Sequence, residues 1–557
     1  MASQGESSLP ERAKSEESGA LSKNALKKAA KEKEKAEKAA KRAEQEKQER
    51  EKAEANDTAK HLYGKIEGGL VDQKTAPLLT SFRDLSPKFE GKEITIRARV
   101  HNARAQSAKL AFLDLRQRTE NVQAVIAEGE GTQISRQMVK WVGSLNRESI
   151  VLVTGLVKTP KDPVHSATIS NLELHIGKVF VVSEGPVQLP MQVKDAMHPP
   201  PVGEEENTEA EVDSQGAPIV TLATRLNNRV LSLRTPTDQA IFHINGAVCE
   251  LFREHCLKNG FQELQTPKIA GAATEGGAGV FEINYFNTPA FLSQSPQFWK
   301  QMAIAGDMER VFEIGPVFRA ENSNTPRHLT EFTGLDFEME IQHTWEEIID
   351  YAESLLLFIF RGLRERCKYH MNVIQREYPD AGNFQIPEGP APRLRFAEGS
   401  KMLKEAGIEA SEDEDISTTN EKTLGKLVLQ KYNTDFYFLT HYPSGARPFY
   451  THLSPNPNSS SPPLTHSYDA FMRGQEIVSG AQRIHDPQEL ENRMRSMDPP
   501  LDPESEGFKH YVQAFRMGCA PHGGGGFGLN RITMLWLGLG NIRQATLFPR
   551  DPGRKAP

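Results

Sequence analysis

The chain has 557 residues, of which 38% are hydrophobic, enough for three or four domains and a large core. Its net charge of −7 excludes a uniformly basic nucleic-acid coat, so any contact with RNA must come from local patches. The longest apolar run, Leu355–Phe360, is too short to cross a membrane, and the N-terminus lacks the pattern of a secretion or mitochondrial leader. The cysteines form no CxxC pair, which argues against a structural zinc site or a disulfide framework. We therefore expect a cytoplasmic protein without membrane contact.

Residues 1–75 form a tail rich in alanine, lysine and glutamate. Within it, Leu21–Ala43 holds nine basic and three acidic residues and no apolar stripe. Such a segment is helical or disordered, and at best a lone solvated helix. Two interpretations stay open: a charged, solubilising tail, or a basic extension that adds affinity for RNA through phosphate contacts.

Residues 76–185 contain short stretches of alternating polarity, which are typical of strands. The predicted elements are strands at 93–100, 110–115, 122–126, 150–155 and 167–176, and a helix at 135–145. Five strands with one helix between the third and fourth is the order of an OB-fold, with a generic small barrel as the alternative.

Residues 186–225 are predicted to be a hinge or linker, because their proline and glutamate runs cannot contribute to a core. Residues 226–557 mix strands and helices without βαβ periodicity, which favours an antiparallel α+β domain. Segments 411–419 and 454–463 resemble surface insertions.

Several elements of this last domain are predicted from local patterns. A helix with apolar residues at helical spacing ends at Gly260, and a strand follows at 261–267. Two further strands join near Gly474. A strand at 511–517 and a helix at 532–537 flank a run of four glycines.

Two arginine-containing segments are the most informative. One is Phe318-Arg319-Ala320-Glu321, and the other is HGGGGFGLNR, His522–Arg531. Permanently charged guanidinium groups suit the two ends of a nucleoside triphosphate, and glycines let the backbone approach a base or a phosphate. In isolation, a surface salt bridge and a floppy loop would explain these segments as well.

Three segments, 238–269, 311–340 and 518–540, resemble in order motifs 1, 2 and 3 of the class II aminoacyl-tRNA synthetases. The phrases TEGGAGVFEINYF, SQSPQFWKQ, TGLDFEME and GQEIVSGAQRIHD are similar to the aspartyl-tRNA synthetase family of eukaryotes and archaea, and the resemblance extends from residue 85 to the end. It implies an α+β fold, with an OB-fold β-barrel that binds the anticodon and a catalytic antiparallel sheet flanked by helices. It also implies a homodimer, with Pro267 of motif 1 at the interface.

The implied activity joins L-aspartate to tRNA(Asp), with ATP as the energy source and Mg²⁺ as the cofactor. The implied catalytic residues are Arg319, Arg531 and Glu476. The implied ATP-binding residues are Arg319, Glu321, Arg327, His328, Leu329, Phe332, Glu476, Gly526, Phe527, Gly528, Leu529 and Arg531. The implied aspartate-binding residues are Glu275, Gln297, Lys300, Arg319, Asp336, Ser479 and Arg483. The implied Mg²⁺ ligands are Asp469 and Glu476. The implied anticodon-binding residues are Phe112, Gln123, Ser166 and Glu173.

The resemblance also implies how the enzyme would select aspartate. Arg483 and Lys300 would hold the side-chain carboxylate of aspartate, and Asp336 would orient Lys300. An asparagine amide in the same place would leave the guanidinium partly unpaired, at a cost of roughly 3 kcal/mol or more. Two alternatives remain: an asparaginyl-tRNA synthetase, and a non-catalytic tRNA-binding paralogue. Asn530, where many relatives carry glutamate, is expected to face away from ATP.

Overall fold

The computed structural model describes residues 57–69, 76–200, 212, 216, 218–272, 279–411, 415–455 and 463–556. Most of the predicted tail lies outside these ranges. The chain divides into two compact units, Met1–Val187 and Gln188–Pro557. Within the described ranges, no helix has the length and apolar character needed to cross a membrane.

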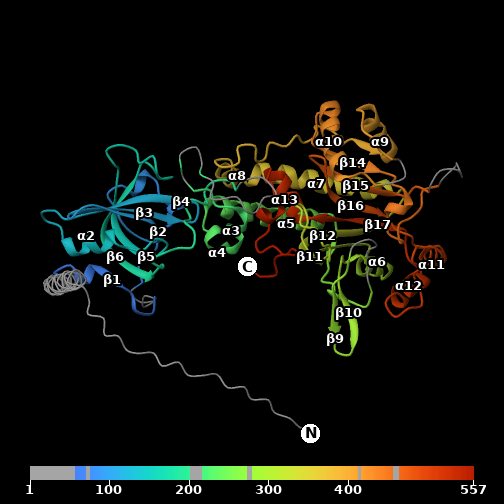
Figure 1. Ribbon diagram of the computed structural model, residues 1–557, viewed down its shortest axis with the longest axis horizontal. Helices are drawn as coiled ribbons and strands as arrows, with labels where there is room; N and C mark the ends of the chain where they lie inside the picture. The colour runs from blue at the N-terminus through green and yellow to red at the C-terminus, as the bar shows by residue number, and fades with distance from the viewer. Residues whose placement is uncertain are drawn as a thin grey trace, which may run out of the picture. The chain divides into compact units, whose positions relative to one another are not determined.

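The first unit is a six-stranded sheet, of which the strands β2 to β6 close into a barrel while β1 pairs with β6 alone (Figure 1). Its strands are β1 (Tyr63–Lys65), β2 (Glu93–Ser107), β3 (Leu110–Gln117), β4 (Glu120–Ala127), β5 (Ile150–Lys158) and β6 (Glu173–Ser183), and its helix is α2 (Arg136–Gly143). The strand order is β1-β6-β4-β3-β2-β5, and pairing of β6 with β5 closes the barrel. Four short 3₁₀ turns surround it: η1 (Lys60–Leu62), η2 (Glu67–Gly69), η3 (Phe82–Asp84) and η4 (Pro87–Phe89). The five long strands, with α2 between β4 and β5, confirm the predicted OB-fold.

Alternation along the strands builds the barrel core. In β3, Ala111, Leu113 and Leu115 are fully buried, whereas the residues between them are mostly half-buried. The barrel also begins before residue 76, since Ala59 and Leu62 belong to the same core and β1 pairs with β6. Part of the predicted tail is therefore packed structure.

The fifth long strand begins later than the predicted range of 167–176. Residues 167–172 lie in a turn, because the chain folds back on itself: the Val164 amide donates to the Ser170 carbonyl at 2.8 Å and the Ala167 amide to the Val164 carbonyl at 3.0 Å. The strand begins only at Glu173.

In the second unit, part of the predicted linker is packed. Met191, Ala196 and Val220 form a small buried cluster against Leu231. Two short helices follow, α3 (Leu222–Asn227) and α4 (Arg229–Ser232).

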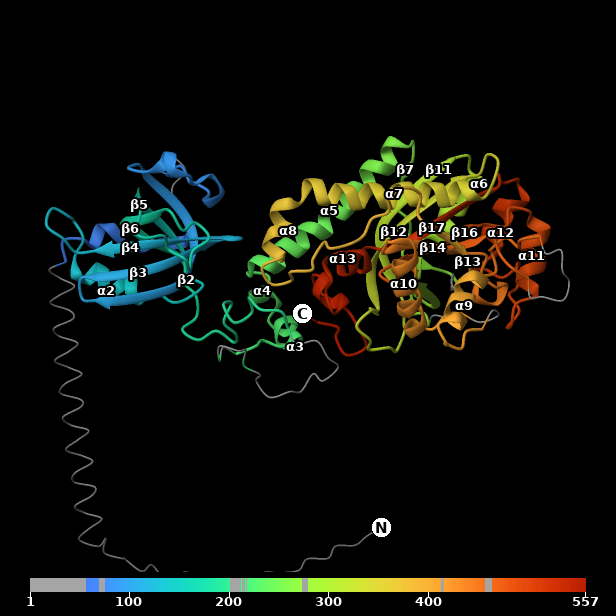
Figure 2. The same ribbon diagram turned by 90° about the horizontal axis from the view of Figure 1, so that it is seen from above.

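An eight-stranded sheet forms the centre of the second unit (Figure 2). Its order is β13-β14-β15-β16-β17-β12-β11-β7, and only the edge pairs β13–β14 and β7–β11 are parallel. The strands are β7 (Gln262–Glu263), β11 (Arg310–Phe318), β12 (Glu331–Glu340), β13 (Arg393–Arg395), β14 (Phe436–Thr440), β15 (Ser467–Met472), β16 (Gln475–Gln482) and β17 (His522–Gly528). This sheet confirms the predicted antiparallel α+β architecture. A separate hairpin sheet, β8 (Ile269–Ala270), β9 (Glu282–Tyr285) and β10 (Thr288–Leu292), projects from it.

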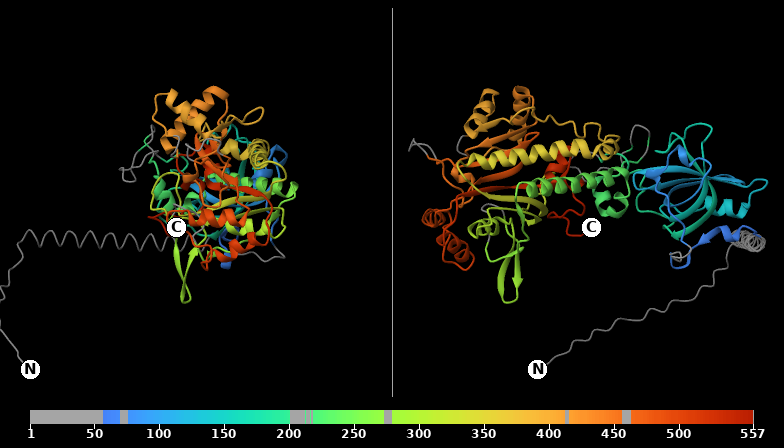
Figure 3. Two further views of the ribbon diagram at one scale, coloured as in Figure 1. Left: turned by 90° about the vertical axis from the view of Figure 1, so that its right-hand side faces the viewer. Right: turned by 180° about the vertical axis from the view of Figure 1, so that it is seen from behind.

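Helices cover one face of the large sheet. The long helices α5 (Pro236–Lys258) and α7 (Glu346–Arg366) run side by side, as both views of Figure 3 show. With α8 (Lys368–Ile374) and α13 (Leu529–Leu537), they bury the largest hydrophobic cluster against β11, β12 and β17. The remaining helices are α6 (Gln297–Ala305), α9 (Phe396–Glu405), α10 (Thr418–Tyr432), α11 (Pro487–Arg495), α12 (Lys509–Arg516), η5 (Ser444–Ala446) and η6 (Ile542–Ala545).

Strand β12 shows how the sheet separates core from site. Leu335, Phe337 and Met339 pack into the helix-covered core. Because side chains alternate along a strand, Asp336 and Glu338 point to the opposite face. The two acidic residues are therefore buried on a polar face.

Local predictions in this unit had mixed outcomes. Helix α5 ends as predicted before Gly260, whose φ is +78°. The hairpin turn at Gly474 and the helix at 532–537 are also confirmed. The strand predicted at 261–267 is shorter, since only Gln262–Glu263 pairs and Pro267 has no amide hydrogen to continue a ladder.

The strand predicted at 511–517 was wrong, because this segment lies in helix α12. Tyr511, Val512, Ala514 and Phe515 are buried, a helical spacing that packs against the cluster containing Phe298. The glycine run that follows forms strand β17 rather than a loop. A Cβ atom at Gly524 would collide with the carbonyl oxygen of Phe337, so glycine is required for β17 to lie against β12.

Candidate active site

A cavity of about 370 Å³ opens on the polar face of the large sheet. The strands β11, β12, β16 and β17, the β11–β12 loop and the start of α13 contribute to its wall. Fifteen of the residues predicted for the site line this cavity: Gln297, Arg319, Glu321, Arg327, His328, Leu329, Phe332, Asp336, Glu476, Ser479, Arg483, Gly526, Phe527, Gly528 and Arg531. Sequence segments more than two hundred residues apart thus meet at one site.

Four predicted residues have other positions. Lys300 is fully buried beside the cavity, and Leu529 packs in the hydrophobic core. Asp469 is buried behind the cavity wall and pairs with Arg447. Glu275 lies outside the described residues.

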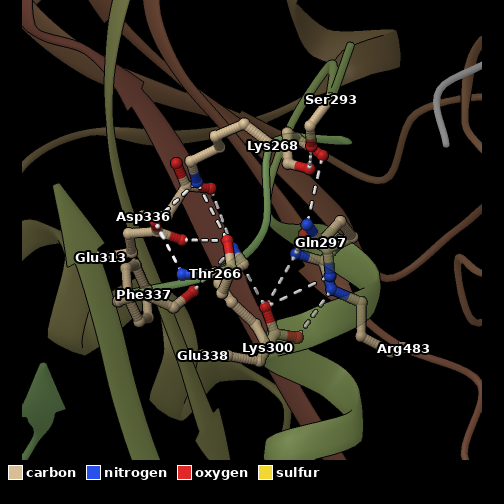
Figure 4. A network of polar contacts seen from close by, with 11 residues as sticks. Thr266, Lys268, Ser293, Gln297, Lys300, Glu313, Asp336, Phe337, Glu338 and Arg483 are labelled. Carbon is tan, nitrogen blue, oxygen red and sulfur yellow. Dashed lines mark hydrogen bonds and ion pairs between the residues drawn. The ribbon is translucent and has the colours of Figure 1, made fainter. Parts of the chain in front are cut away.

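At one end of the cavity, charged side chains form a closed network (Figure 4). The Lys300 ammonium group lies 3.0 Å from Asp336 Oδ1 and 3.4 Å from Glu338 Oε2. The Arg483 guanidinium group donates to Glu338 Oε1 at 2.9 Å and to Gln297 Oε1 at 3.2 Å. Two cations and two carboxylates therefore balance one another, and we call Lys300, Asp336, Glu338 and Arg483 the charge quartet.

Glu338 is the centre of the charge quartet, and no residue pattern singled it out. Its burial opposes ionisation, but the charges of Arg483 and Lys300 outweigh this effect, so the pKa of Glu338 lies below its ordinary value. An ionised Glu338 fixes both cations. The signal in the sequence is the alternation in TGLDFEME, which places Glu338 on the same face as Asp336.

Three arginines line the cavity away from the charge quartet. Arg319 follows β11 directly, its guanidinium group lies 5.5 Å from the Phe332 ring, and its buried Nε has no hydrogen-bond partner within the described part of the chain. Arg531, in the first turn of α13, donates to the Glu476 carbonyl at 2.8 Å. Arg327, in the β11–β12 loop, pairs with Glu421 at 3.2 Å. An anion would supply the missing partner of Arg319.

His328 lies in the same loop and accompanies these arginines. Its Nδ1 lies 2.6 Å from the Thr325 hydroxyl, and its Nε2 lies 3.8 Å from Glu321. Burial lowers the pKa of His328, and the nearby arginines lower it further, against the opposing charge of Glu321. A neutral imidazole is therefore expected at neutral pH.

Several carboxylates lie close to the three arginines. Burial raises the pKa of Glu476, and the charge of Asp469 raises it further. Burial and the charge of Glu476 raise the pKa of Glu421 to about 7, and burial also raises the pKa of Asp415. Buried acids whose pKa values are raised by burial and by one another's charge indicate a place where a cation would be stabilised.

The residues present fit a magnesium ion bound together with a phosphate chain. The described residues include no group of three or more His, Cys, Asp or Glu side chains arranged to hold a metal. Magnesium usually takes only one or two carboxylates and completes its shell with phosphates and water, so Glu476 at the cavity wall meets this need. Asp469 is already engaged: Arg447 donates to its two oxygens at 3.0 and 2.7 Å, and to Ser479 at 2.8 Å.

In the barrel, the predicted anticodon residues lie toward one face. Gln123 on β4 pairs in register with Asp114 on β3 and Glu173 on β6, and its amide donates to Glu173 at 3.3 Å. Phe112 shares the face of Asp114 and is only half-buried, so its ring is not part of the barrel core. Arg104, which the sequence did not suggest, lies over this ring at 5.5 Å.

Ser166 belongs to the loop before β6 and adjoins this face. Its carbonyl accepts from the Asn121 side chain at 3.2 Å, and the same amide donates to Asp114 at 2.9 Å. The barrel therefore presents an aromatic ring beside several hydrogen-bonding groups, an arrangement suited to splayed, single-stranded bases.

Comparisons with known proteins agree with this geometry. Residues 221–552 match the family model of class II tRNA synthetases (D, K and N), and residues 94–182 match that of the OB-fold nucleic acid binding domain. The chain is 46% identical to the cytoplasmic aspartate–tRNA ligase of Homo sapiens, over 90% of this chain and 96% of that protein. It is 43% identical to the cytoplasmic aspartate–tRNA ligase 1 of Arabidopsis thaliana, over 96% and 98% of the two chains.

Solved structures give the same picture. An aspartyl-tRNA synthetase from Entamoeba histolytica superposes with a TM-score of 0.77 at 40% identity, covering 89% of this chain and 96% of that one. An asparaginyl-tRNA synthetase from Pyrococcus horikoshii, complexed with asparaginyl-adenylate, gives a TM-score of 0.71 at 28% identity, covering 87% and 100%. The chain belongs to the class II tRNA synthetase family (D, K and N).

Proposed function

We propose that this enzyme is an aspartate–tRNA ligase, which activates L-aspartate with ATP and transfers it to the 3′ end of tRNA(Asp). The observation that supports this most directly is the cavity that joins the charge quartet, with Arg483, to the cluster of Arg319, Arg327 and Arg531. One end suits a dicarboxylic amino acid and the other suits a triphosphate. The relatives named as cytoplasmic aspartate–tRNA ligases support both the activity and a cytoplasmic location.

In the first step, the α-carboxylate of aspartate attacks the α-phosphorus of ATP. A bond forms between carboxylate oxygen and phosphorus, the bond to the β-phosphate oxygen breaks, and pyrophosphate leaves. In the second step, the terminal ribose hydroxyl of the tRNA attacks the acyl carbon and AMP leaves. No side chain acts as a nucleophile, so the enzyme contributes alignment and charge stabilisation.

Arg319 is proposed to hold the α-phosphate together with the substrate carboxylate, because the buried Nε of its guanidinium group is an unpaired donor within the described part of the chain. Arg531, Arg327 and His328 would hold the outer phosphates, Phe332 would stack on the adenine, and Glu321 would accept from its amino group. Glu476 would hold Mg²⁺ with the phosphates, and Asp469 would have to leave its pairing with Arg447 to serve as a further ligand. Bound there, the ion would neutralise charge that develops on the leaving pyrophosphate.

Selection of aspartate is assigned to Arg483 and Lys300, with Gln297 and Ser479 binding the rest of the amino acid. Described contacts of Arg483 use Nε and Nη2, which leaves Nη1 for the substrate carboxylate. The amide NH₂ group of asparagine is itself a hydrogen-bond donor and could not accept from Arg483 Nη1. We therefore expect strong discrimination against asparagine in favour of aspartate.

Recognition of tRNA is assigned to Phe112, Gln123, Ser166 and Glu173 on the barrel. A homodimer is proposed from the motif 1 resemblance, with the exposed Pro267 at its interface.

The test is pyrophosphate exchange with aspartate and asparagine in parallel, followed by charging of purified tRNA(Asp) and tRNA(Asn). We expect exchange with aspartate and charging of tRNA(Asp). Exchange with asparagine alone would reassign the enzyme to the asparaginyl branch, and no exchange with either would indicate a non-catalytic relative.

A second experiment tests the basic tail. Deletion of residues 1–56, which spares the packed segment at 57–69, should weaken tRNA binding several-fold at low salt and much less at high salt. Adenylate formation should stay unchanged, because it needs no tRNA. Equal tRNA affinity of the two forms at low salt would leave the tail with a solubilising role.

A further inference from the structure

The ion pair between Arg327 and Glu421 joins two distant segments at the phosphate end of the cavity. Arg327 Nη1 lies 3.2 Å from Glu421 Oε2, and both side chains line the cavity. The side chain of Arg327 is 26% exposed, whereas that of Glu421 is 11% exposed. Among the described residues, Glu421 is the one hydrogen-bond or ion-pair partner of this guanidinium group. The position of the arginine therefore depends on the glutamate.

Glu421 itself is rigidly supported. It lies near the start of α10, whose first turn is capped by the Ser417 hydroxyl, which accepts from the Asn420 amide at 3.4 Å. One turn further on, Gly425 packs directly on Gly474 in the β15–β16 turn, and a Cβ atom at Gly425 would collide with it. The helix is thus fixed against the hairpin that carries Glu476.

Arg327, in contrast, extends from a loop into a region of like charge. Burial lowers the pKa of Arg531, and the charges of Arg327 and Arg319 lower it further, which reflects how closely the three arginines approach. Repulsion by the other two favours rotation of Arg327 into solvent. Glu421 opposes that rotation.

The charged and titratable groups around Glu421 are Arg327, Asp415, Tyr437, Asp469, Glu476 and Arg531.

We infer that Glu421 is a positioning residue that holds the Arg327 guanidinium group at the phosphate end of the cavity before ATP binds. The inference rests on the proposed role of Arg327 as a phosphate ligand. Because the rotamer freedom of Arg327 is lost in advance, binding of ATP does not bear that entropic cost. Glu421 is not assigned a contact with the reacting atoms. Its substitution should therefore change the affinity for ATP rather than the rate of the chemical step.

The experiment is a double-mutant cycle with Glu421→Ala, Arg327→Ala and the double variant. Affinity for Mg²⁺·ATP is measured by calorimetry without aspartate or tRNA, and KM and kcat are measured by pyrophosphate exchange. We expect Glu421→Ala to weaken ATP binding about three- to tenfold, with kcat within about twofold of the parent. In the Arg327→Ala background, the second substitution should have no further effect.

Controls keep the result interpretable. Lys426→Gln changes an exposed charge on the same helix and should leave ATP affinity unchanged. Glu421→Gln preserves the shape of the side chain and should weaken binding in the same direction by a smaller factor. It serves as the main variant if Glu421→Ala does not fold.

Three results would overturn the inference. Tighter ATP binding by Glu421→Ala would mean that the glutamate competes with phosphate, and a full additional loss in the double variant would mean that it acts independently of Arg327. If Arg327→Ala leaves ATP binding unchanged, the inference fails together with the role assigned to Arg327. Aspartate-dependent exchange by the parent enzyme would still report the proposed function separately.

Discussion

The two ends of the cavity are built on opposite principles. At the proposed amino-acid end, the charge quartet pairs each cation with a carboxylate among buried neighbours, so both cations are held in place without a ligand. At the nucleotide end, Arg319 has an orphaned donor, and acids such as Glu421 and Glu476 are held above their ordinary pKa. In the proposed function, the first end would reject the wrong amino acid because its geometry is fixed, whereas the second end would gain its missing charges from the nucleotide.

The largest effect is expected from Glu338→Gln at the amino-acid end. Without the central carboxylate, Lys300 and Arg483 lose their shared partner while still buried, which costs about 3–5 kcal/mol of unfolding free energy. Aspartate-dependent pyrophosphate exchange should fall by about a thousandfold or more, because Lys300 and Arg483, which would bind the substrate carboxylate, lose their orientation. Denaturant unfolding and exchange kinetics measure these two effects. Glu340→Gln, on the same strand, is the control and should change both by little.

A sharper test of this comparison replaces one arginine at each end of the cavity, Arg483 or Arg319, with leucine. Arg483→Leu leaves Glu338 buried beside a single cation and should lower the free energy of unfolding by about 2–4 kcal/mol. Arg319→Leu removes a group that has an unpaired atom and should lower the free energy of unfolding by about 1 kcal/mol or less. Both variants should lose exchange. Only Arg483→Leu should still bind ATP, as calorimetry would show. Equal destabilisation by the two substitutions, or retained aspartate activation by Arg483→Leu, would contradict the contrast between the ends.

An effect of opposite sign, a gain in stability, is expected from Glu421→Gln. Burial and the charge of Glu476 raise the pKa of Glu421 to about 7, so ionisation of this group opposes folding. That destabilisation is complete above pH 7 and is lost only below the unfolded value near 4.5. Glu421→Gln should therefore raise the free energy of unfolding by about 1–3 kcal/mol at pH 8 and leave it nearly unchanged at about pH 4. A loss of stability at pH 8 would show that pairing with Arg327 outweighs burial.

The sequence was most informative where a motif carries both fold and chemistry. Arg319, Phe332 and Arg531 could be predicted because their neighbours in the chain resemble known motifs, and the structure brings all three to one cavity. The antiparallel sheet and the OB-fold could also be predicted, since their alternating residues are local signals.

The residues that were missed act through long-range contacts. Arg447 and Glu421 lie in segments without a recognisable motif, and their importance appears only when folding brings them to Asp469 and Arg327. Helix α12 was missed for a different reason: Tyr-Val-Gln-Ala-Phe has an apolar pattern that satisfies both a strand and a helix, and packing against α6 and α11 decides between them.

The glycine strand β17 has a consequence for how such an enzyme can change over time. Gly526 and Gly528 present bare backbone to the cavity, and at Gly524, on the same strand, there is no volume for even one additional methyl group. A missense change at Gly524 would push β17 away from β12 and its Glu338, so it would disrupt the sheet rather than create a new preference. Any drift in which amino acid is accepted must therefore arise in the walls, at positions such as Gln297 and Arg483, where one side chain can replace another.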